Sequence, residues 1–363
     1  WNVGGLGIIF SLLFLIFIIF SCLLINKKLS NYKYKYHLIF LIIILSIPSL
    51  KLISGPSIKL IESINPATQG YLGGMGLPII FSWFIGGLLS AGVAFVIGKI
   101  CIGLRSDYLA ISTLLISGIV ISVIKHEEWL SRGVKNVIGL KRPAPFEVNL
   151  QKSEWFMTLI DKIYFWAPTT KDIIISSSGI FVKLCFTIIF SITLLTLLYL
   201  SERAVNSPWG RMMRAIRDNE TSAKAMGKNI VKQQLNIFMI GSAIIGFAGA
   251  MLVTYDGLFT PSSYQPLRYT FLIWVMVLLG GSGNNYGSIL GAFVVWFIWI
   301  ESAPIALFII NFCTFFLEYN NPIKLHLIES VPYFRYLMMG VGLLLVMRYK
   351  PEGLLPEKKI SFK

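Results

Sequence analysis

The strongest constraint on this chain is a series of long apolar stretches that recur along nearly its whole length. A helix crosses a hydrocarbon core of about 30 Å with about 20 apolar residues. Residues 6–25 form the first stretch, which has no charged side chain and is too long for the apolar core of a signal peptide. Similar stretches follow at residues 38–54, 77–100, 107–124, 176–200, 234–254, 270–281, 287–312 and 334–348. The sequence therefore predicts one all-α, polytopic membrane domain over residues 1–363, a helical bundle with about nine transmembrane helices (eight to ten).

The composition supports a membrane protein and excludes several other classes. Of the 363 residues, 55% are apolar and 13% are charged, whereas roughly a quarter are charged in soluble domains. A soluble enzyme, a disordered protein and a disulfide-bonded secreted domain are excluded. The net charge of +15 comes from basic residues between the apolar stretches, so it describes membrane loops and not a face that binds nucleic acid. The four cysteines and three histidines lie at unrelated positions and predict no metal site.

Basic side chains predict the orientation in the membrane. When the stretches alternate in direction, one side receives 18 Lys and Arg residues, including those of residues 201–233 and of the C-terminal tail. The short segments of the other side receive 4; the segment 125–173 is left out because the charge rule is weak for long loops. We therefore predict a multi-pass membrane protein with the C-terminus in the cytoplasm and Trp1 outside.

Residues 125–173 form a predicted external loop that is too long for a passive turn. The loop carries mixed charges together with Trp129, Trp155 and Trp166. Two interpretations stay open. The loop lies on the membrane interface through its tryptophans, or it is a platform for docking or gating.

Residues 207–227 predict a single amphipathic helix on the cytoplasmic side. Ser207 offers an N-cap, Pro208 suits the first helical position, and Gly227 offers a stop. Five residues at helical spacing form a weakly apolar stripe: Met212, Ile216, Asn219, Ala223 and Met226. Four others form a basic side: Arg211, Arg214, Arg217 and Lys224. These residues alone leave three interpretations open: a helix on anionic lipid, a solvated basic loop, and a docking helix for a partner protein.

The same segment resembles the cytoplasmic segment of branched-chain amino acid ABC transporter permeases of the LivM type. The similarity rests on Pro208-Trp209-Gly210-Arg211-Met212-Met213-Arg214-Ala215-Ile216-Arg217-Asp218-Asn219-Glu220, followed by Ala223 and Gly227. Four further stretches are similar to family motifs: 106–114 (SDYLAISTL), 244–250 (IIGFAGA), 280–292 (GGSGNNYGSILGA) and 348–355 (RYKPEGLL). One such stretch alone is weak, but five in the family's order make the resemblance specific.

The resemblance implies the permease subunit of an ATP-driven importer of branched-chain or related hydrophobic amino acids, which works by alternating access. It also implies a complex in the lipid bilayer with ABC ATPase subunits, a second homologous permease and an external solute-binding protein. By the same resemblance, the residues that couple the permease to the ATPase are Arg211, Arg214, Ile216, Arg217, Glu220, Ala223 and Gly227. ATP and Mg²⁺ would be used by the partner, and no cofactor is expected on this chain, whose sequence contains no P-loop.

The chain departs from the family in three places. Glu220 and Gly227 are seven residues apart, where the general coupling motif has six. Residues 1–70 show no clear version of the family's glycine-rich first span, and the charged loop 125–173 replaces a glycine-rich external segment. These departures leave the substrate open, with urea or a short amide as the alternative. A stand-alone ion-coupled carrier and a membrane scaffold without transport are the rivals from other classes, and no catalytic triad suggests an enzyme.

Small residues recur at helical spacing in two predicted spans. Gly283, Gly287 and Gly291 are each four residues apart, which would place them on one helical face. A matching strip in the preceding long span consists of Ser242, Gly246 and Ala250, with Gly249 beside it. We expect tight helix packing along these strips, or a hinge within the solute pathway.

A solute pathway through the bundle is expected to be mostly apolar with a few polar contacts. The candidates are Thr113, Ser117, Ser242 and Glu301. Glu301 stands out because an ionisable group at membrane depth is costly, and Pro304 nearby predicts a helix break that would expose polar backbone to a cavity. We therefore expect Glu301 to line the pathway or to pair within the bundle.

Overall fold

A computed structural model describes most of the chain. The described residues are 5–28, 35–64, 78–104, 106–127, 133, 136–138, 140, 142–165, 170–261, 265–316 and 321–357. Trp129 and Trp166, which support the interfacial interpretation of the loop 125–173, lie outside this set. Within it, most residues are α-helical.

Six of the described helices are long and apolar enough to cross a membrane. They are α3 (Ile79–Cys101), α4 (Ser106–His126), α8 (Lys171–Asn206), α11 (Ile230–Asp256), α13 (Asn285–Cys313) and α15 (Val331–Tyr349). Three further helices coincide with the remaining predicted stretches: α1 (Gly5–Lys28), α2 (Lys35–Ile64) and α12 (Pro266–Gly280). The prediction of an all-α polytopic membrane protein is confirmed, while the number of about nine spans stays a prediction.

The chain divides into two compact units. The first unit contains residues 1–190 and 219–264, and the second contains residues 191–218 and 265–363. The chain passes between the units at three points: within α8, between α9 (Pro208–Asp218) and α10 (Glu220–Ala225), and between residues 264 and 265. The predicted helix over residues 207–227 therefore contributes one part to each unit.

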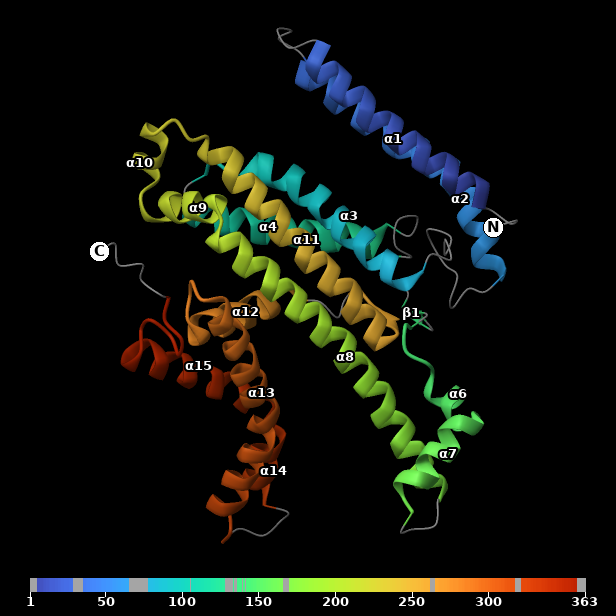
Figure 1. The fold of residues 1–363 in the computed structure, drawn as a ribbon, viewed down its shortest axis with the longest axis vertical. Coiled ribbons are helices and arrows are strands. Elements are labelled where there is room, and N and C mark those ends of the chain that lie inside the picture. The colour runs from blue at the N-terminus through green and yellow to red at the C-terminus, as the bar shows by residue number, and fades with distance from the viewer. Residues whose placement is uncertain are drawn as a thin grey trace. The chain divides into compact units, whose positions relative to one another are not determined.

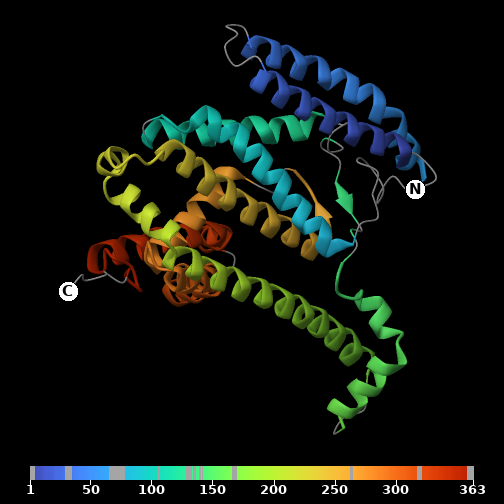
Figure 2. The same cartoon turned by 45° about the horizontal axis from the view of Figure 1, so that its top comes forward.

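In the first unit, α3 and α11 pack closely along their length (Figure 1). Trp83 donates a hydrogen bond from Nε1 to Oγ1 of Thr254 at 2.9 Å, and both side chains are buried. The hydroxyl of Ser90 donates to the carbonyl oxygen of Ser242 at 2.7 Å. These polar bonds suit a membrane interior, where a buried hydroxyl or indole N–H has no water as an alternative partner. Figure 2 shows α1 and α2 as a second pair of helices lying side by side.

The loop 125–173 is folded where the structure describes it. It contains α6 (Glu147–Gln151) and α7 (Glu154–Ile163), and its strand β1 (Val137–Ile138) pairs antiparallel with β2 (Leu258–Phe259), directly after α11. Apolar residues of the loop form a core with α8: Ala144, Leu150, Phe156, Ile160, Val182 and Phe186. The loop is thus attached to both α8 and the end of α11 within the first unit.

In the second unit, α13 packs against α12 and α15. The buried residues of this core are Leu272, Val275, Leu279, Val295, Trp299 and Met339. Beside α15 lies the short helix α14 (Pro322–Glu329). Trp299 meets Tyr336 of α15 edge to face, with ring centres 5.6 Å apart.

The predicted break near Pro304 is wrong, because α13 runs as one helix from Asn285 to Cys313. Pro304 removes one backbone N–H, which leaves the carbonyl of Ile300 without its usual helical partner. A membrane helix tolerates this loss when neighbouring helices support it. The argument that a break exposes polar backbone beside Glu301 therefore no longer holds.

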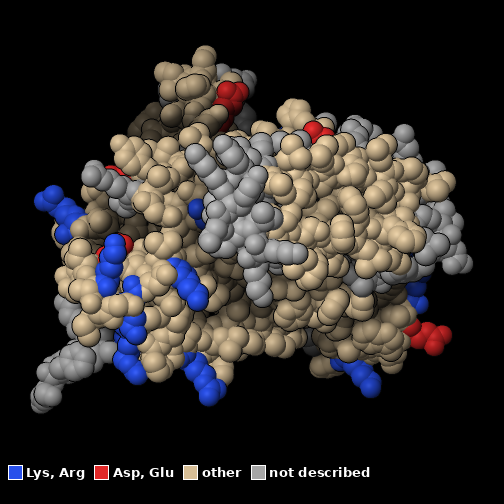
Figure 3. Space-filling view, turned by 90° about the horizontal axis from the view of Figure 1, so that it is seen from above, with Lys and Arg blue, Asp and Glu red and all other residues tan. Residues whose placement is uncertain are grey.

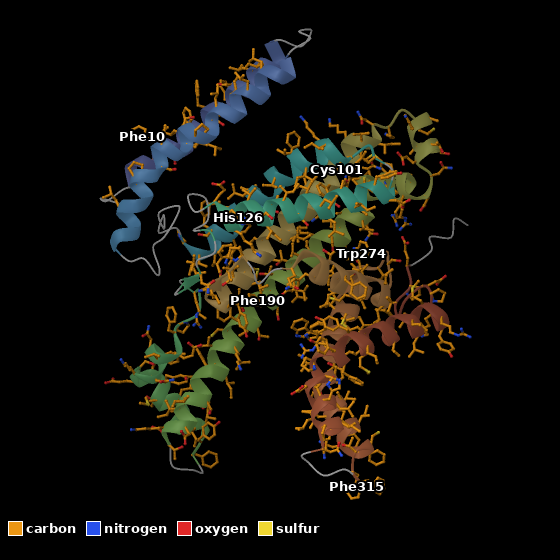
Figure 4. All side chains as sticks on the ribbon, turned by 180° about the vertical axis from the view of Figure 1, so that it is seen from behind. Phe10, Cys101, His126, Phe190, Trp274 and Phe315 are labelled. Carbon is orange, nitrogen blue, oxygen red and sulfur yellow. The ribbon has the colours of Figure 1, made fainter. Side chains whose placement is uncertain are left out.

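Large apolar side chains cover much of the outer surface. Examples are Phe10 on α1 and Phe315 directly after α13, which are 62% and 79% exposed and project from the chain in Figure 4. Most of the face seen in Figure 3 is neither basic nor acidic, and the basic side chains gather over part of it. An apolar exterior of this extent is stable only against lipid or other apolar chains.

Candidate functional site

The sequence predicts one helix over residues 207–227, but the structure has two. The helix α9 ends at Asp218, and the side chain of Asn219 caps α10 by accepting a hydrogen bond from the backbone N–H of Ser222 at 3.0 Å. Asn side chains compete in this way with the helical backbone and favour caps over helix interiors. Asn219 belongs to the predicted apolar stripe. The preference of asparagine for helix caps was the sequence signal for a break at this position.

The beginning of the segment is as predicted. Ser207 lies at the N-cap of α9, and its Oγ accepts a hydrogen bond from the N–H of Gly210 at 3.3 Å. Gly210 is required at this turn, because an added Cβ would overlap the carbonyl oxygen of Val205. The end of α8 and the start of α9 are therefore fixed in backbone contact.

The three arginines of α9 all bind groups of their own chain. Arg211 donates to the carbonyl oxygen of Asn206 at 3.4 Å, and Arg214 donates to that of Val205 at 3.3 Å. These bonds satisfy carbonyls at the C-terminal end of α8, where positive charge is also favoured by the helix dipole. Arg217 donates to Asp218 at 3.1 Å and to Glu357 at 3.0 Å. The hydrogen bond to Glu357 is the main cause that raises the pKa of Arg217 above its ordinary value.

Burial separates the predicted coupling residues into two groups. Ile216 of α9 and Ala223 of α10 are buried, at 7% and 8% exposure, so neither side chain is open to a partner. Glu220 and Gly227 are exposed, as is Met226 at 81%. Within the described residues, the exposed surface of this segment that an outside protein could contact therefore includes α10 and the turn after it.

Gly227 ends α10 as the sequence predicts. Its φ of +76° is left-handed, and its N–H donates to the carbonyl of Lys224 at 3.0 Å, as in glycine-terminated helices. No atom of the described residues lies within 4 Å of the position that a Cβ on Gly227 would take. The residue is needed here for its backbone conformation and is open to a partner.

The cap at Asn219 gives a testable prediction. We expect Asn219→Ala to accelerate amide hydrogen exchange in residues 220–225 about fivefold, because a lost N-cap costs about 1 kcal/mol. Asn229→Ala is the matched control, since Asn229 makes the same bond to the N–H of Lys232 but caps α11. If both variants leave exchange in residues 220–225 unchanged, Asn219 does not hold α10 in place.

The glycine strip of the second unit is a site of close backbone approach. An added Cβ on Gly287 would lie 2.7 Å from the carbonyl oxygen of Gly280, and one on Gly291 would lie 2.8 Å from the Cα of Gly280. Gly283 does not share their helical face, contrary to the prediction, because Asn284 caps α13 and leaves Gly283 in the preceding turn with a φ of +95°. The α12–α13 packing therefore depends on Gly280, Gly287 and Gly291.

The strip in α11 contacts α3, and the two predicted strips do not lie in one unit. An added Cβ on Gly246 would overlap Ser90 and lie 3.0 Å from the carbonyl oxygen of Gly86. Gly249 differs, because nothing lies within 4 Å of its Cβ position among the described residues. The structure thus gives close packing at Gly246 and none at Gly249.

The predicted pathway residues are divided between the two units. The hydroxyls of Thr113 and Ser117 donate to carbonyls of their own helix, α4, at 2.9 and 2.6 Å, and Ser242 lies on α11. Glu301 belongs to the second unit, where it is half-buried and forms no ion pair with any described side chain. A shared solute pathway through these four residues therefore stays a prediction.

One charged residue at membrane depth was missed by the sequence reasoning. Arg335 lies on α15 with its guanidinium carbon 4.9 Å from the centre of the Trp299 ring, a cation–π contact. Its Nε is buried and has no hydrogen-bond partner within the described part of the chain. The sequence alone could have identified it, because Arg335 is a charged residue inside the predicted span 334–348. A half-buried cation in a helix long enough to cross a membrane is a candidate pathway residue, like Glu301.

The described helices and their glycine contacts define the class as a multi-pass, all-α membrane protein. Comparison with known proteins then identifies the family: the chain belongs to the permease components of branched-chain amino acid transport systems, whose family model matches residues 63–347. The helices α3 to α15, with both parts of the segment 207–227, all lie almost entirely within this match.

Individual relatives agree with the family. The chain is 30% identical over 278 residues to the probable branched-chain amino acid transport permease protein LivM of Methanocaldococcus jannaschii, covering 75% of this chain and 68% of that protein. It is 24% identical over 282 residues to the high-affinity branched-chain amino acid transport system permease proteins LivM of Salmonella typhimurium and Escherichia coli, covering 77% of this chain. It spans 58% of the length of each of these two relatives. No solved structure matches the chain.

Proposed function

We propose that this permease component carries branched-chain or related hydrophobic amino acids inward, driven by a separate ABC ATPase. The family match over residues 63–347 is the observation that carries the proposal. The LivM relatives are named for branched-chain amino acid transport, whereas the fructose and xylose permeases FrcC and XylH match only about a quarter of the chain. This difference in coverage favours amino acids over other solutes.

The orientation supports an ATPase on the side of the segment 207–227. That side carries 18 basic residues, against 4 in the short segments of the opposite side, and basic loops stay in the cytoplasm. The C-terminal tail lies on the same side by this rule. The proposed location is therefore a bacterial inner membrane, with the coupling segment and the C-terminus in the cytoplasm.

The contacts within the coupling segment suggest how it would meet the ATPase. The arginines of α9 bind carbonyls of α8 and the carboxylate of Glu357, so α9 is a rigid base held by its own chain. On α10, Glu220 and Lys224 are exposed, and the turn that follows presents Met226 and Gly227. We infer that α10 and this turn make the direct contact, and that α9 receives the displacement. ATP and Mg²⁺ bind to the ATPase and not to this chain.

The loop 125–173 is the proposed external surface for a solute-binding protein. Its described part is anchored by β1–β2 pairing and by a core with α8, which a loop resting passively on lipid does not need. Trp155 on α7 packs edge to face against Phe181 of α8 and remains 54% exposed. A second homologous permease would complete the complex and cover part of the apolar exterior.

Uptake of labelled leucine into proteoliposomes tests the proposal. With the complete complex and an external binding protein, we expect uptake only when ATP is present on the ATPase side, and competition by isoleucine and valine but not by urea or xylose. Uptake by this chain without the ATPase, driven by a proton gradient, would instead establish a stand-alone carrier. ATP-dependent uptake competed by urea alone would keep the importer and change its substrate.

A further inference from the structure

The chain folds back on itself after α15, over residues 350–357. In the second unit, the N–H of Leu354 donates to the carbonyl of Leu279 at 3.0 Å, and the N–H of Leu355 donates to that of Gly280 at 2.9 Å. This tail therefore lies along the end of α12, next to the turn that leads into α13 (Figure 1). Backbone hydrogen bonds fix its position independently of side-chain identity.

Glycines at this junction bring the two backbones into direct contact. Gly281 and Gly353 have φ angles of +120° and +83°, which residues with a Cβ rarely adopt. An added Cβ on Gly281 would overlap the carbonyl oxygen of Leu355, and one on Gly353 would overlap the Cα of Gly281. The tail and the α12–α13 turn are consequently held together without an intervening side chain.

The far end of the tail reaches α9. Glu357 accepts a hydrogen bond from Nη1 of Arg217 at 3.0 Å, and its carboxylate also lies beside Gly283 in the α12–α13 turn. The side chain of Asn284 donates to the carbonyl of Pro356 at 3.3 Å. Glu357 thus contacts α9 on one side and the α12–α13 turn on the other.

A second bond joins the same two parts of the unit. Asn285, the first residue of α13, donates from Nδ2 to Oε1 of Glu202 at 2.9 Å, and Glu202 belongs to the last turns of α8. Since Arg211 and Arg214 bind the end of α8, α9 has two connections to the start of α13. One runs through α8 and Asn285, and the other runs through the tail and Glu357.

We propose that residues 350–357 are a strap that passes the displacement of α9 to the α12–α13 pair, with Arg217 and Glu357 as its positioning residues. The inference rests on the proposed function, in which an ATPase moves the segment 207–227. Helices α12 and α13 are in backbone contact at Gly280, Gly287 and Gly291, so a pull on their turn moves both helices together.

The ion pair between Arg217 and Glu357 is exposed, which allows a role in coupling to be tested separately from a role in folding stability. The side chains of Arg217 and Glu357 are 54% and 30% exposed, and pairs this accessible contribute little to folding stability. Removing the pair should therefore leave the subunit folded. The backbone bonds of Leu354 and Leu355 would still hold most of the tail, so the effect of the substitution is confined to the link with α9.

Glu357→Gln in the complete complex tests the strap. We expect the number of leucine molecules transported per ATP hydrolysed to fall about fivefold, the size typical of coupling elements remote from both sites. The thermal midpoint and the amount of co-purified ATPase should stay at wild-type levels. Lys350→Gln is the matched control: it also removes one charge from the tail, and the Lys350 side chain makes no hydrogen bond or ion pair with any described residue. It should transport like the wild type.

Charge reversal provides the decisive comparison. Arg217→Glu and Glu357→Arg should each reduce coupling, and the double variant should restore at least half of it, because the ion pair is re-formed with its charges exchanged. Wild-type coupling in Glu357→Gln, or additive losses without rescue in the double variant, would overturn the strap. The wild-type complex separates the two proposals. If it shows no ATP-dependent leucine uptake, the proposed function fails; if it shows uptake and the strap variants behave like it, the strap alone is wrong.

Discussion

Replacing Gly291 by alanine is expected to lower the thermal midpoint of the detergent-purified subunit by about 5–10 °C. The added Cβ would lie 2.8 Å from both the Cα and the N of Gly280 and would overlap the carbonyl of Met276. These are backbone atoms of α12, so no side chain can rotate away, and the two helices must separate. Differential scanning fluorimetry of monodisperse protein measures the change.

Gly340→Ala is the control for replacing a helical glycine by alanine where no close backbone contact is present. Gly340 lies on α15 in the same unit, and nothing lies within 4 Å of its Cβ position in the described structure. Alanine there should leave the midpoint unchanged or raise it slightly, because glycine inside a helix costs roughly 0.5–1 kcal/mol relative to alanine. Equal midpoints for the Gly291 and Gly340 variants would show that α12 and α13 do not meet at Gly291.

Gly227→Arg and Glu220→Arg are expected to leave the subunit inserted and folded but to lose the ATPase. Both positions are exposed on α10 and its terminal turn, so the substitutions disturb no internal packing. A bulky cation placed in a docked interface should weaken the complex by roughly 30-fold or more, equivalent to about 2 kcal/mol. Co-purification of the ATPase, together with ATP-dependent leucine uptake, measures the loss.

Gly227→Ala isolates the backbone contribution at the same position. It imposes the same left-handed strain, about 1–2 kcal/mol, without adding bulk or charge. We expect this variant to retain the ATPase and most of the transport. If Gly227→Arg and Glu220→Arg both transport like the wild type, the turn after α10 is not the contact surface.

The sequence by itself determined the class of the protein and the positions of its helices. Apolar stretches of about 20 residues have few alternatives in lipid, because every backbone polar group must be bonded within the segment. The caps of the segment 207–227 were also local: Ser207 bonds a backbone N–H three residues later, and Gly227 takes a left-handed φ. The break at Asn219 was equally local, because the asparagine side chain bonds a backbone N–H three residues later. Helical periodicity alone does not contain this signal and therefore predicts one continuous helix.

Only the tertiary structure decided which groups contact one another. The basic side of α9 suggested three arginines available to a partner, but Arg211 and Arg214 bind the end of α8 and Arg217 binds the distant Glu357. Likewise, the spacing of small residues indicated close packing without naming the neighbour. Gly246 meets α3, Gly287 and Gly291 meet α12, and a Cβ on Gly249 would meet no described residue within 4 Å. Hydrophobic periodicity and caps depend on residues a few positions apart, whereas such contacts depend on side chains brought together from far along the chain, which no local pattern specifies.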